Sequence, residues 1–391
     1  MSTATDTDND WREAWDREHG GTRSIWKLTR DVNKRTRTDI RNFLLSIALD
    51  AEFVDRVVRK YHDAGCAYPV FANLRNGLWY RPRWNGTCYF KSGDGHSRRW
   101  AFSYARLNLH LAVRAAKAGG CIVVDSTRRG KRFPDSFTAT VPIWCAVLNR
   151  LIESAGGRGE GWDTSLHTPS WLSPSEAAQI EELVDGWLNG LGSAADLLRD
   201  RLCACVSKPL RPVWLSPDSL LLEGMLPAGD PGCLAFTPVI CVSASKVTTP
   251  HEHRSRHGWA YIQGAGDDEE NWSRGLSPAA FWANSAALVA TARGDAGPGP
   301  GDSEEGFLEV LEAVLEGRPV PAPTVPVPPP TGGGGATSAT PLRPGGVQAA
   351  GEEGAAAANV AARRSCGDAT GVVGVGADVG AGGMRDLGLD I

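Results

Sequence analysis

Apolar residues recur at helical spacing in several parts of the chain. Residues 37–63 place apolar side chains three and four positions apart, with charged residues on the opposite face. A second helix is predicted over 101–117, and Gly119 and Gly120 follow its last turn. The same pattern predicts further helices over 137–155, 174–191 and 193–204.

Short apolar runs lie between these helices. The run CIVVD at 121–125 is typical of a strand that is buried on both faces. Similar runs predict strands at 212–215, 238–244 and 258–263. Because strands alternate with helices, we expect an α/β protein with a layered mixed sheet and flanking helices.

The pattern changes near residue 291. Every Trp and Tyr lies before residue 283, and from 291 onward Gly, Ala and Pro dominate, apart from a short amphipathic helix predicted at 303–317. Such a composition buries too little apolar area to offset the entropy lost on ordering. We therefore expect a flexible N-terminus at 1–22, one domain at 23–290 and a disordered Gly/Ala/Pro-rich tail at 291–391.

Charge is unevenly distributed along the chain. Residues 21–150 hold 24 Lys and Arg against 9 Asp and Glu, a balance of +15, whereas the whole chain carries −4. Such a block is typical of proteins with a polyanionic partner; the alternative is a basic face balanced by the acidic half. There is no apolar run of membrane-spanning length and no signal-peptide pattern, and most of the nine cysteines lie in apolar stretches. These features favour a cytoplasmic protein with reduced thiols and no membrane partner.

The loop after the predicted strand 121–125 is the first candidate site. Asp125 ends the strand, and polar or basic residues follow it: Ser126, Thr127, Arg128, Arg129, Lys131 and Arg132. A helix begins near 134–136. Loops that lead from the carboxyl end of a strand into a helix bind phosphate in α/β proteins, and Arg and Lys add charge-assisted bonds. The pattern predicts an anion site; the alternative is that these cations pair with distant acidic residues.

The stretch 78–110 interleaves aromatic residues with cations. Its cations are Arg81, Arg83, Lys91, Arg98, Arg99 and Arg106. Phosphates of RNA need positive charge and its exposed bases stack on aromatic rings, so this composition suits an RNA-binding surface. The turn SGDGH also places Asp94 and His96 in a Gly-rich loop, where an imidazole could move a proton near neutral pH. The alternative is that the aromatic residues are core and the loop histidine has no role.

The stretch 260–272 combines an apolar run, a Gly turn and four acidic residues. Asp267 and Asp268 follow the turn and could hold a hard cation such as Mg²⁺ through oxygen ligands. The alternative is that they provide negative charge at a helix N-terminus.

Taken together, these segments resemble the initiator-tRNA phosphoribosyltransferase family. The resemblance covers about residues 25–285, in order and with similar spacing. The stretches that carry it are SIALDAEFV at 46–54, NLRNGLWY at 73–80, YFKSGDGH at 89–96, WAFSYARLNLHL at 100–111, GGCIVVDSTRRGKRFPDS at 119–136, VPIWCAVLNR at 141–150, YIQGAGDDEE at 261–270 and LSPAAFW at 276–282. Glu269 stands where the family commonly has a histidine. The family's C-terminal domain, which is similar to dual-specificity phosphatases, is expected to be absent, because Cys366 lacks a Cys-x₅-Arg loop.

The resemblance implies a pentosyltransferase that modifies tRNA. Family members transfer a 5-phosphoribosyl group from phosphoribosyl pyrophosphate, with Mg²⁺, to the 2′-OH of a T-stem adenosine (position 64) of initiator methionine tRNA. This modification marks the tRNA as initiator and excludes it from elongation. We expect the chain to act as a monomer.

The implied residue roles follow the three candidate segments. The loop residues Ser126, Thr127, Arg128, Arg129, Lys131 and Arg132 would hold donor phosphates. Asp125 would contact the ribose hydroxyls or Mg²⁺, Asp267 and Asp268 would be further metal ligands, and His96 or Asp94 would be the base. The cations of 78–110 would face tRNA phosphates. Two alternatives remain: a tRNA-binding protein of this family without catalysis, and a phosphatase or phosphodiesterase, which would lack a nucleophile.

Overall fold

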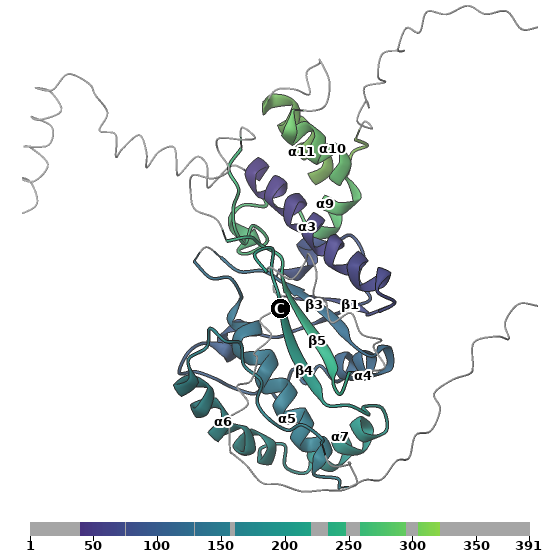
Figure 1. The fold of residues 1–391 in the computed structure, drawn as a ribbon. Helices are drawn as coiled ribbons and strands as arrows, with labels where there is room; N and C mark the ends of the chain where they lie inside the picture. The colour runs from purple at the N-terminus through teal and green to yellow at the C-terminus, as the bar shows by residue number, and fades with distance from the viewer. Residues whose placement is uncertain are drawn as a thin grey trace, which may run out of the picture. The chain divides into compact units, whose positions relative to one another are not determined.

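The computed structural model describes residues 40–74, 76–128, 130–156, 161–219, 234–247, 259–294 and 304–320. Within these residues, five strands form one sheet in the order β2-β1-β3-β5-β4 (Figure 1). Their bounds are β1 Val70–Asn73, β2 Gly86–Cys88, β3 Cys121–Asp125, β4 Leu210–Leu215 and β5 Thr237–Ser243. The predicted α/β class is confirmed. Every pairing between these strands is parallel, where a mixed sheet was expected.

The central strand β3 sends its side chains into two apolar clusters. Cys121 and Val123 face one cluster, while Ile122 and Val124 face the other, as the two-residue period of a strand requires. Its neighbour β5 is also buried along its whole length. Parallel strands that are covered on both faces have continuous apolar sequences, and for this reason the runs at 121–125 and 238–244 could be recognised as strands.

Helices cover both faces of the sheet (Figure 1). The cluster on one face includes residues of α4 Leu109–Ala118, α5 Val141–Glu153, α6 Pro174–Asn189 and α7 Ala194–Cys203. The cluster on the other face includes residues of α3 Ile40–Asp63, α9 Pro278–Ala283, α10 Ser285–Arg293 and α11 Glu304–Leu315. Short turns complete the order: the 3₁₀ helices η1 Gly77–Tyr80, η2 Ser92–Gly95 and η5 Glu269–Asn271, and one π-helical turn, η3 Ser136–Thr140.

Helix α11 belongs to the packed body. Phe307, Leu311 and Val314 are buried in the cluster that also holds α3, and the helix packs on α9 and α10. The core therefore continues past residue 290, into the stretch that the composition assigns to a tail. The expected flexible N-terminus at 1–22 and the rest of the tail, from residue 321, lie outside the described residues.

Two predicted elements differ from the structure. The strand expected at 258–263 is absent from its described residues, 259–263. Instead the N–H groups of Ala260 and Ile262 donate to Asn42 Oδ1 (3.0 Å) and Ser46 Oγ (2.8 Å) on α3. The helix expected from residue 101 begins only at Leu109, after Asn108 adopts a left-handed backbone (φ 46°). No helix in the described part of the chain has the length and apolar character needed to cross a membrane.

Candidate functional site at the carboxyl edge of the sheet

The strand order places a switch point between β1 and β3. From β1 the chain passes to β2 on one side, and β3 then lies on the other side of β1. The loops that leave β1 and β3 therefore diverge above the carboxyl edge of the sheet, where open α/β sheets bind their ligands. Asn73, Asp125 and Ser243 end β1, β3 and β5 at this edge. The loop singled out by the sequence, 126–135, starts at the switch point.

Asp125 is enclosed rather than open to a ligand. Its side chain is fully buried, and Oδ2 accepts hydrogen bonds from Asn73 Nδ2 (2.7 Å) and Ser136 Oγ (3.0 Å). Its Oδ1 accepts from the N–H of Ser126 (2.8 Å). One carboxylate thus connects the end of β1, the start of the loop and the first turn of η3. These contacts give Asp125 a positioning role at the switch point.

Ser126 and Thr127 form the buried base of the loop. The Tyr80 hydroxyl donates to Ser126 Oγ (2.7 Å) and accepts from the N–H of Gly266 (3.0 Å). Burial raises the pKa of Tyr80, so its hydroxyl keeps the proton that it donates. At Gly264 (φ 70°) a Cβ atom would lie 2.6 Å from the carbonyl oxygen of Thr127. Glycine therefore allows the 264–268 loop to lie directly on the β3 loop.

Arg128 joins the two loops through an ion-pair cluster. Its Nε donates to Asp267 Oδ2 (2.7 Å) and its Nη2 donates to Asp268 Oδ1. The hydrogen bond to Asp267 raises the pKa of Arg128, which stays charged. Asp268 holds a left-handed backbone (φ 51°), which a non-glycine residue rarely adopts. The cation predicted to bind phosphate and the carboxylates predicted to bind metal are thus paired with each other.

Lys131 and His96 meet at a carboxylate that the sequence did not single out. Asp135 Oδ1 accepts from Lys131 Nζ (2.6 Å), and its Oδ2 lies 3.2 Å from His96 Nδ1. The His96 side chain is 57% exposed. Because Nδ1 faces Asp135, the other ring nitrogen, Nε2, is left to face outward or toward a substrate. Asp135 therefore connects the β3 loop to the loop after η2.

A cavity of about 230 Å³ lies between these groups. Its lining residues are Ser92, Thr127, Arg128, Lys131, Pro134, Asp135 and Asp267. The Ser92 hydroxyl oxygen is buried and, among the described residues, has no hydrogen-bond partner. Two cations, two carboxylates and two hydroxyls at the switch point make a cavity that suits a charged, oxygen-rich ligand.

The remaining two loop cations differ in position. Arg132 does not line the cavity: its guanidinium donates to Ser216 Oγ (2.7 Å) and Ser219 Oγ (2.9 Å), after the end of β4. Arg129 lies outside the described residues. The structure therefore brings three of the six predicted donor-binding residues, Thr127, Arg128 and Lys131, to the cavity wall.

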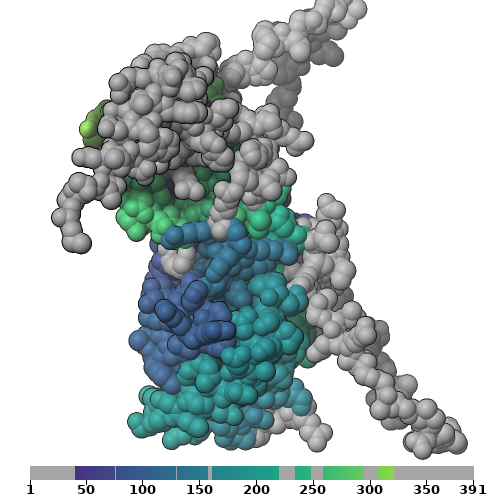
Figure 2. Space-filling model, turned by 90° about the vertical axis from the view of Figure 1, so that its left-hand side faces the viewer, coloured from purple at the N-terminus to yellow at the C-terminus, as the bar shows by residue number. Residues whose placement is uncertain are grey.

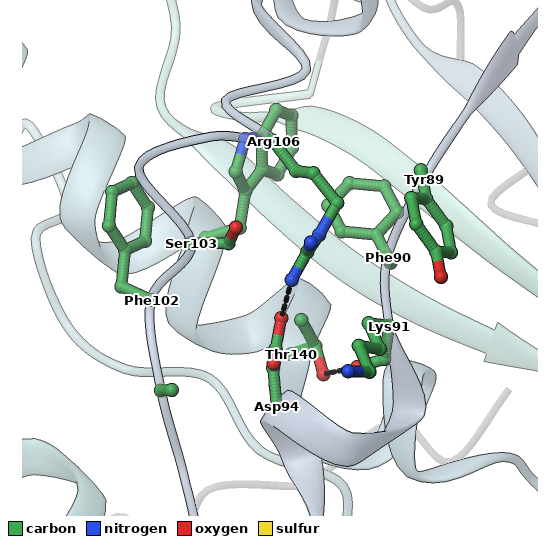
Figure 3. Close-up of a pocket in the computed structure, with 10 residues that line it drawn as sticks. Tyr89, Phe90, Lys91, Asp94, Phe102, Ser103, Arg106 and Thr140 are labelled. Atoms are coloured by element: carbon green, nitrogen blue, oxygen red, sulfur yellow. Dashed lines mark hydrogen bonds and ion pairs between the residues drawn. The ribbon is translucent and has the colours of Figure 1, made fainter.

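The cations of 78–110 divide into paired and exposed residues. Arg106 and Asp94 point toward one another beside Tyr89 (Figure 3), with Nη2 and Oδ2 2.8 Å apart. Arg81 is paired with Asp55 in the same way (2.9 Å). Arg83, Lys91, Arg98 and Arg99 are exposed. The ion pair of Asp94 makes it a structural anchor of the η2 loop, so His96 is the better candidate for a base.

A buried polar network supports the 264–268 loop from below. Asp50 on α3 accepts hydrogen bonds from Tyr261 Oη and Ser245 Oγ, both 2.7 Å, and Ser245 Oγ accepts from the N–H of Gly264 (3.0 Å). Burial raises the pKa of Asp50 well above its usual value. No local pattern indicates this network, because its members lie far apart in the chain.

The proposed metal ligands fit Mg²⁺ only in part. Asp267 and Asp268 have side chains 12% and 39% exposed, and Asp267 lines the cavity. Mg²⁺ commonly uses one or two carboxylates together with phosphate oxygens of a substrate, which this pair could provide. Asp125 does not fit, because its oxygens already accept three hydrogen bonds. Among the described residues there is no group of three or more acidic, His or Cys side chains placed to hold a metal by itself.

Fold and site together define the class: an α/β protein with a charged, hydroxyl-containing cavity at the switch point of a parallel sheet. The Rit1 N-terminal domain family matches residues 33–297 of the chain, and the chain belongs to this family. The family resemblance predicted from the sequence is thereby confirmed.

Two curated proteins are similar to the chain. The chain is 40% identical over 256 residues to an uncharacterised protein of Schizosaccharomyces pombe, covering 64% of this chain and 53% of the relative. It is 36% identical over 277 residues to a protein of Saccharomyces cerevisiae named tRNA A64-2′-O-ribosylphosphate transferase, covering 67% of this chain and 53% of the relative. The chain thus spans about half the length of these relatives. No solved structure matches it.

Proposed function

We propose that this chain transfers a 5-phosphoribosyl group from phosphoribosyl pyrophosphate to the 2′-OH of adenosine 64 in initiator methionine tRNA. Family membership and the name of the Saccharomyces cerevisiae relative support this activity. The single observation that carries the proposal is the switch-point cavity lined by Thr127, Arg128 and Lys131, which suits a donor with several phosphates.

The proposed reaction is a substitution at C1 of the donor. The 2′-oxygen of the RNA forms a bond to C1, the bond from C1 to the pyrophosphate oxygen breaks, and pyrophosphate leaves with the bonding electrons. The proton of the 2′-OH passes to His96 Nε2, while Asp135 holds Nδ1 (3.2 Å). Positive charge develops on the ribose ring, as in other glycosidic substitutions.

The residues of the cavity divide this work. Lys131 and Arg128 exchange their carboxylate partners for donor phosphates, and Thr127 adds a hydroxyl. Asp267 and Asp268, once released by Arg128, would hold Mg²⁺, which neutralises the leaving pyrophosphate when it is bound. Asp125 positions the loop, and Ser126 supports it through Tyr80. The exposed cations Arg83, Lys91, Arg98 and Arg99 face tRNA phosphates.

Incubation with labelled donor tests the activity. The purified chain, Mg²⁺ and labelled phosphoribosyl pyrophosphate are combined with unmodified initiator methionine tRNA, and with elongator methionine tRNA as the control. We expect label on the initiator only. Absence of label on both tRNAs removes the transferase proposal, and equal label on both removes initiator specificity.

Donor binding is tested separately. Arg128→Ala and Lys131→Ala are each expected to weaken binding of the donor by on the order of 2 kcal/mol, since each removes a charge-assisted contact. Arg199→Ala is the matched control, because Arg199 is also ion-paired but does not line the cavity. Unchanged donor affinity in both cavity variants contradicts the assignment of the β3 loop.

The second candidate is a tRNA-binding protein without catalysis. It is favoured by one observation: the side chains of Arg128 and Lys131 are ion-paired with carboxylates of the protein itself. Such a protein binds initiator tRNA but neither binds the donor nor transfers label, so the same two assays separate the candidates.

A further inference from the structure

Trp171 differs from the other tryptophans of the described chain in its exposure. Its side chain is 41% exposed, and it is the only tryptophan among the exposed large hydrophobic residues there. A ring held in the core would contribute more to stability. An exposed indole in a fixed orientation therefore points to a binding surface.

The indole is fixed by three contacts. It stacks on Phe133, with ring centroids 4.5 Å apart and planes 9° apart, and it meets Trp214 in an edge contact at 5.9 Å. Its Nε1 donates to Thr138 Oγ1 (3.4 Å). Phe133 and Trp214 are buried, so the exposed ring rests on a rigid aromatic support and needs little ordering to bind a flat ligand.

Trp171 lies at the rim of the proposed site. Phe133, on which it stacks, directly precedes Pro134, a residue of the cavity wall. On the other side, Ser173 caps the N-terminus of α6, and Glu176 of that helix accepts a hydrogen bond from Ser97 Oγ (2.6 Å) in the loop of His96 and Arg98. In Figure 2 the surfaces of residues near 90–105 and of the α6 region adjoin on one face.

The charge around the indole suits RNA. Lys131, Arg98 and Arg99 are exposed on the two loops that flank it. Aromatic rings beside cations bind unpaired bases by stacking while the cations contact the phosphates. A neutral hydrophobic peptide would gain nothing from these cations.

We propose that Trp171 is the stacking platform for an exposed base of the RNA substrate, at the rim of the cavity. This inference rests on the proposed function, because it takes RNA as the substrate. In this arrangement Trp171 orients the RNA over the cavity, and the cations contribute the part of the affinity that does not depend on sequence.

The experiment measures binding of unmodified initiator tRNA over a range of salt concentrations. Trp171→Ala is expected to weaken binding by about 5- to 150-fold, the range for one base stacked on an aromatic ring. Trp171→Phe keeps a ring and is expected to retain most of the affinity. The slope of log affinity against log salt should stay unchanged in both variants, because no phosphate contact is removed, whereas Arg98→Ala should reduce that slope by about one.

Leu197→Ala is the control. Leu197 is a large hydrophobic residue with 73% exposure, but it lies on α7 and outside the stretch 78–110. We expect this variant to bind tRNA within about twofold of the wild type. Thermal unfolding of each variant shows whether a loss of tRNA affinity is caused by unfolding. If Trp171→Ala is unstable, the affinity of Trp171→Phe is the deciding measurement.

The outcomes separate the two proposals. If the wild type does not bind tRNA, the proposed function fails and this inference fails with it. If the wild type binds and Trp171→Ala binds equally well, or if Trp171→Phe is as weak as Trp171→Ala, only the stacking role is wrong. A loss rescued by Phe supports the stacking role even where no label is transferred.

Discussion

A single buried carboxylate determines how the β3 loop leaves the sheet. The sequence placed Asp125 at a strand end and suggested ligand contacts for it, because a carboxylate there is exposed in many α/β sites. The structure instead gives its oxygens three donors from β1, the loop backbone and η3. The partners Asn73 and Ser136 stand 52 and 11 positions away, so periodicity could not identify them.

Asp125→Asn is expected to destabilise the fold. Either placement of the amide sets its NH₂ group against a donor, the Ser126 N–H or the Asn73 and Ser136 donors, and an unsatisfied buried group costs about 1–3 kcal/mol. Urea unfolding measures the loss. Asp196→Asn, whose side chain is 77% exposed, is the control and should change stability by less than about 0.5 kcal/mol. Wild-type stability of Asp125→Asn would show that the enclosed geometry is wrong.

Arg98 combines an exposed charge with a strained backbone. Its φ is 62°, a left-handed value that costs a non-glycine residue about 1–2 kcal/mol. Arg98→Gly and Arg98→Ala remove the same charge, but only glycine relieves this strain. We therefore expect the Gly variant to be about 1 kcal/mol more stable than the Ala variant in thermal unfolding, while both lose tRNA affinity equally. Equal stability of the two variants contradicts the backbone assignment.

Elements with a strong pattern could be predicted from the sequence, and short elements could not. The helix α3 and the strands β3, β4 and β5 were recognised because long periodicity or a continuous apolar run marks them. The four-residue β1 and three-residue β2 are too short to show a period. The N–H groups of Ala260 and Ile262, in the apolar segment 259–263, are hydrogen-bonded to polar side chains of α3 rather than to a strand. Sequence patterning does not distinguish these two partners.

The sequence predicted which loop forms the candidate site, but it did not predict the contacts that the loop's side chains make. Six polar and basic residues within 126–132 identified the loop after β3, yet the side chains that face Arg128 lie 139 and 140 positions away. Asp135 was inside the predicted loop, but nothing in its spacing indicated that it would contact both Lys131 and His96. The pairing of distant loops depends on the strand order, which local patterns do not contain.

The segment 261–268 should respond to the protonation of Asp50. Burial raises the pKa of this carboxyl, so above about pH 3.8 the folded chain keeps a proton that the unfolded chain releases. The stability that this proton contributes is present in acid and is lost as the pH rises through the folded-state pKa. The other groups that face Asp50 are the hydroxyls of Tyr261 and Ser245, and Tyr80 lies close enough to be affected by its charge.

Asp50→Asn removes this titration and keeps the shape of the side chain. We expect the free energy of unfolding of the wild type, minus that of the variant, to fall as the pH rises above about 3.8, the usual pKa of Asp, because only the wild type must retain a proton. Urea unfolding of both proteins at several pH values gives this difference and cancels the pH dependence that they share. A difference that stays constant, or that rises with pH, contradicts a raised pKa of Asp50.

At the scale of the whole molecule, acidic residues from the second half of the sequence form ion pairs with the basic block of the first half. The excess of +15 lies in residues 21–150, and the partners of Arg128 come from residues 267 and 268. The described structure therefore combines both interpretations of the charge pattern: at the cavity Arg128 has distant acidic partners and Lys131 a nearby one, and the flanking loops carry exposed cations. Ligand binding at the cavity must replace ion pairs, whereas RNA phosphates can contact the exposed cations directly.

The folded body extends further along the chain than the composition indicates, and variants in α11 can test this. Composition places the end of the domain near residue 290, yet Leu311 is 1% exposed in the cluster that includes α3. Leu311→Ala should lower the free energy of unfolding by about 2–5 kcal/mol, because it leaves a cavity in that cluster. Leu315→Ala, on the same helix with 38% exposure, should cost less than about 1 kcal/mol. Equal losses would show that α11 is not part of the core. If only Leu311→Ala causes a large loss, any shortened chain used to study the switch-point cavity must keep α11. The reason is that α3 shares a core cluster with α11 and is connected to the 264–268 loop through Asp50 and Ser245.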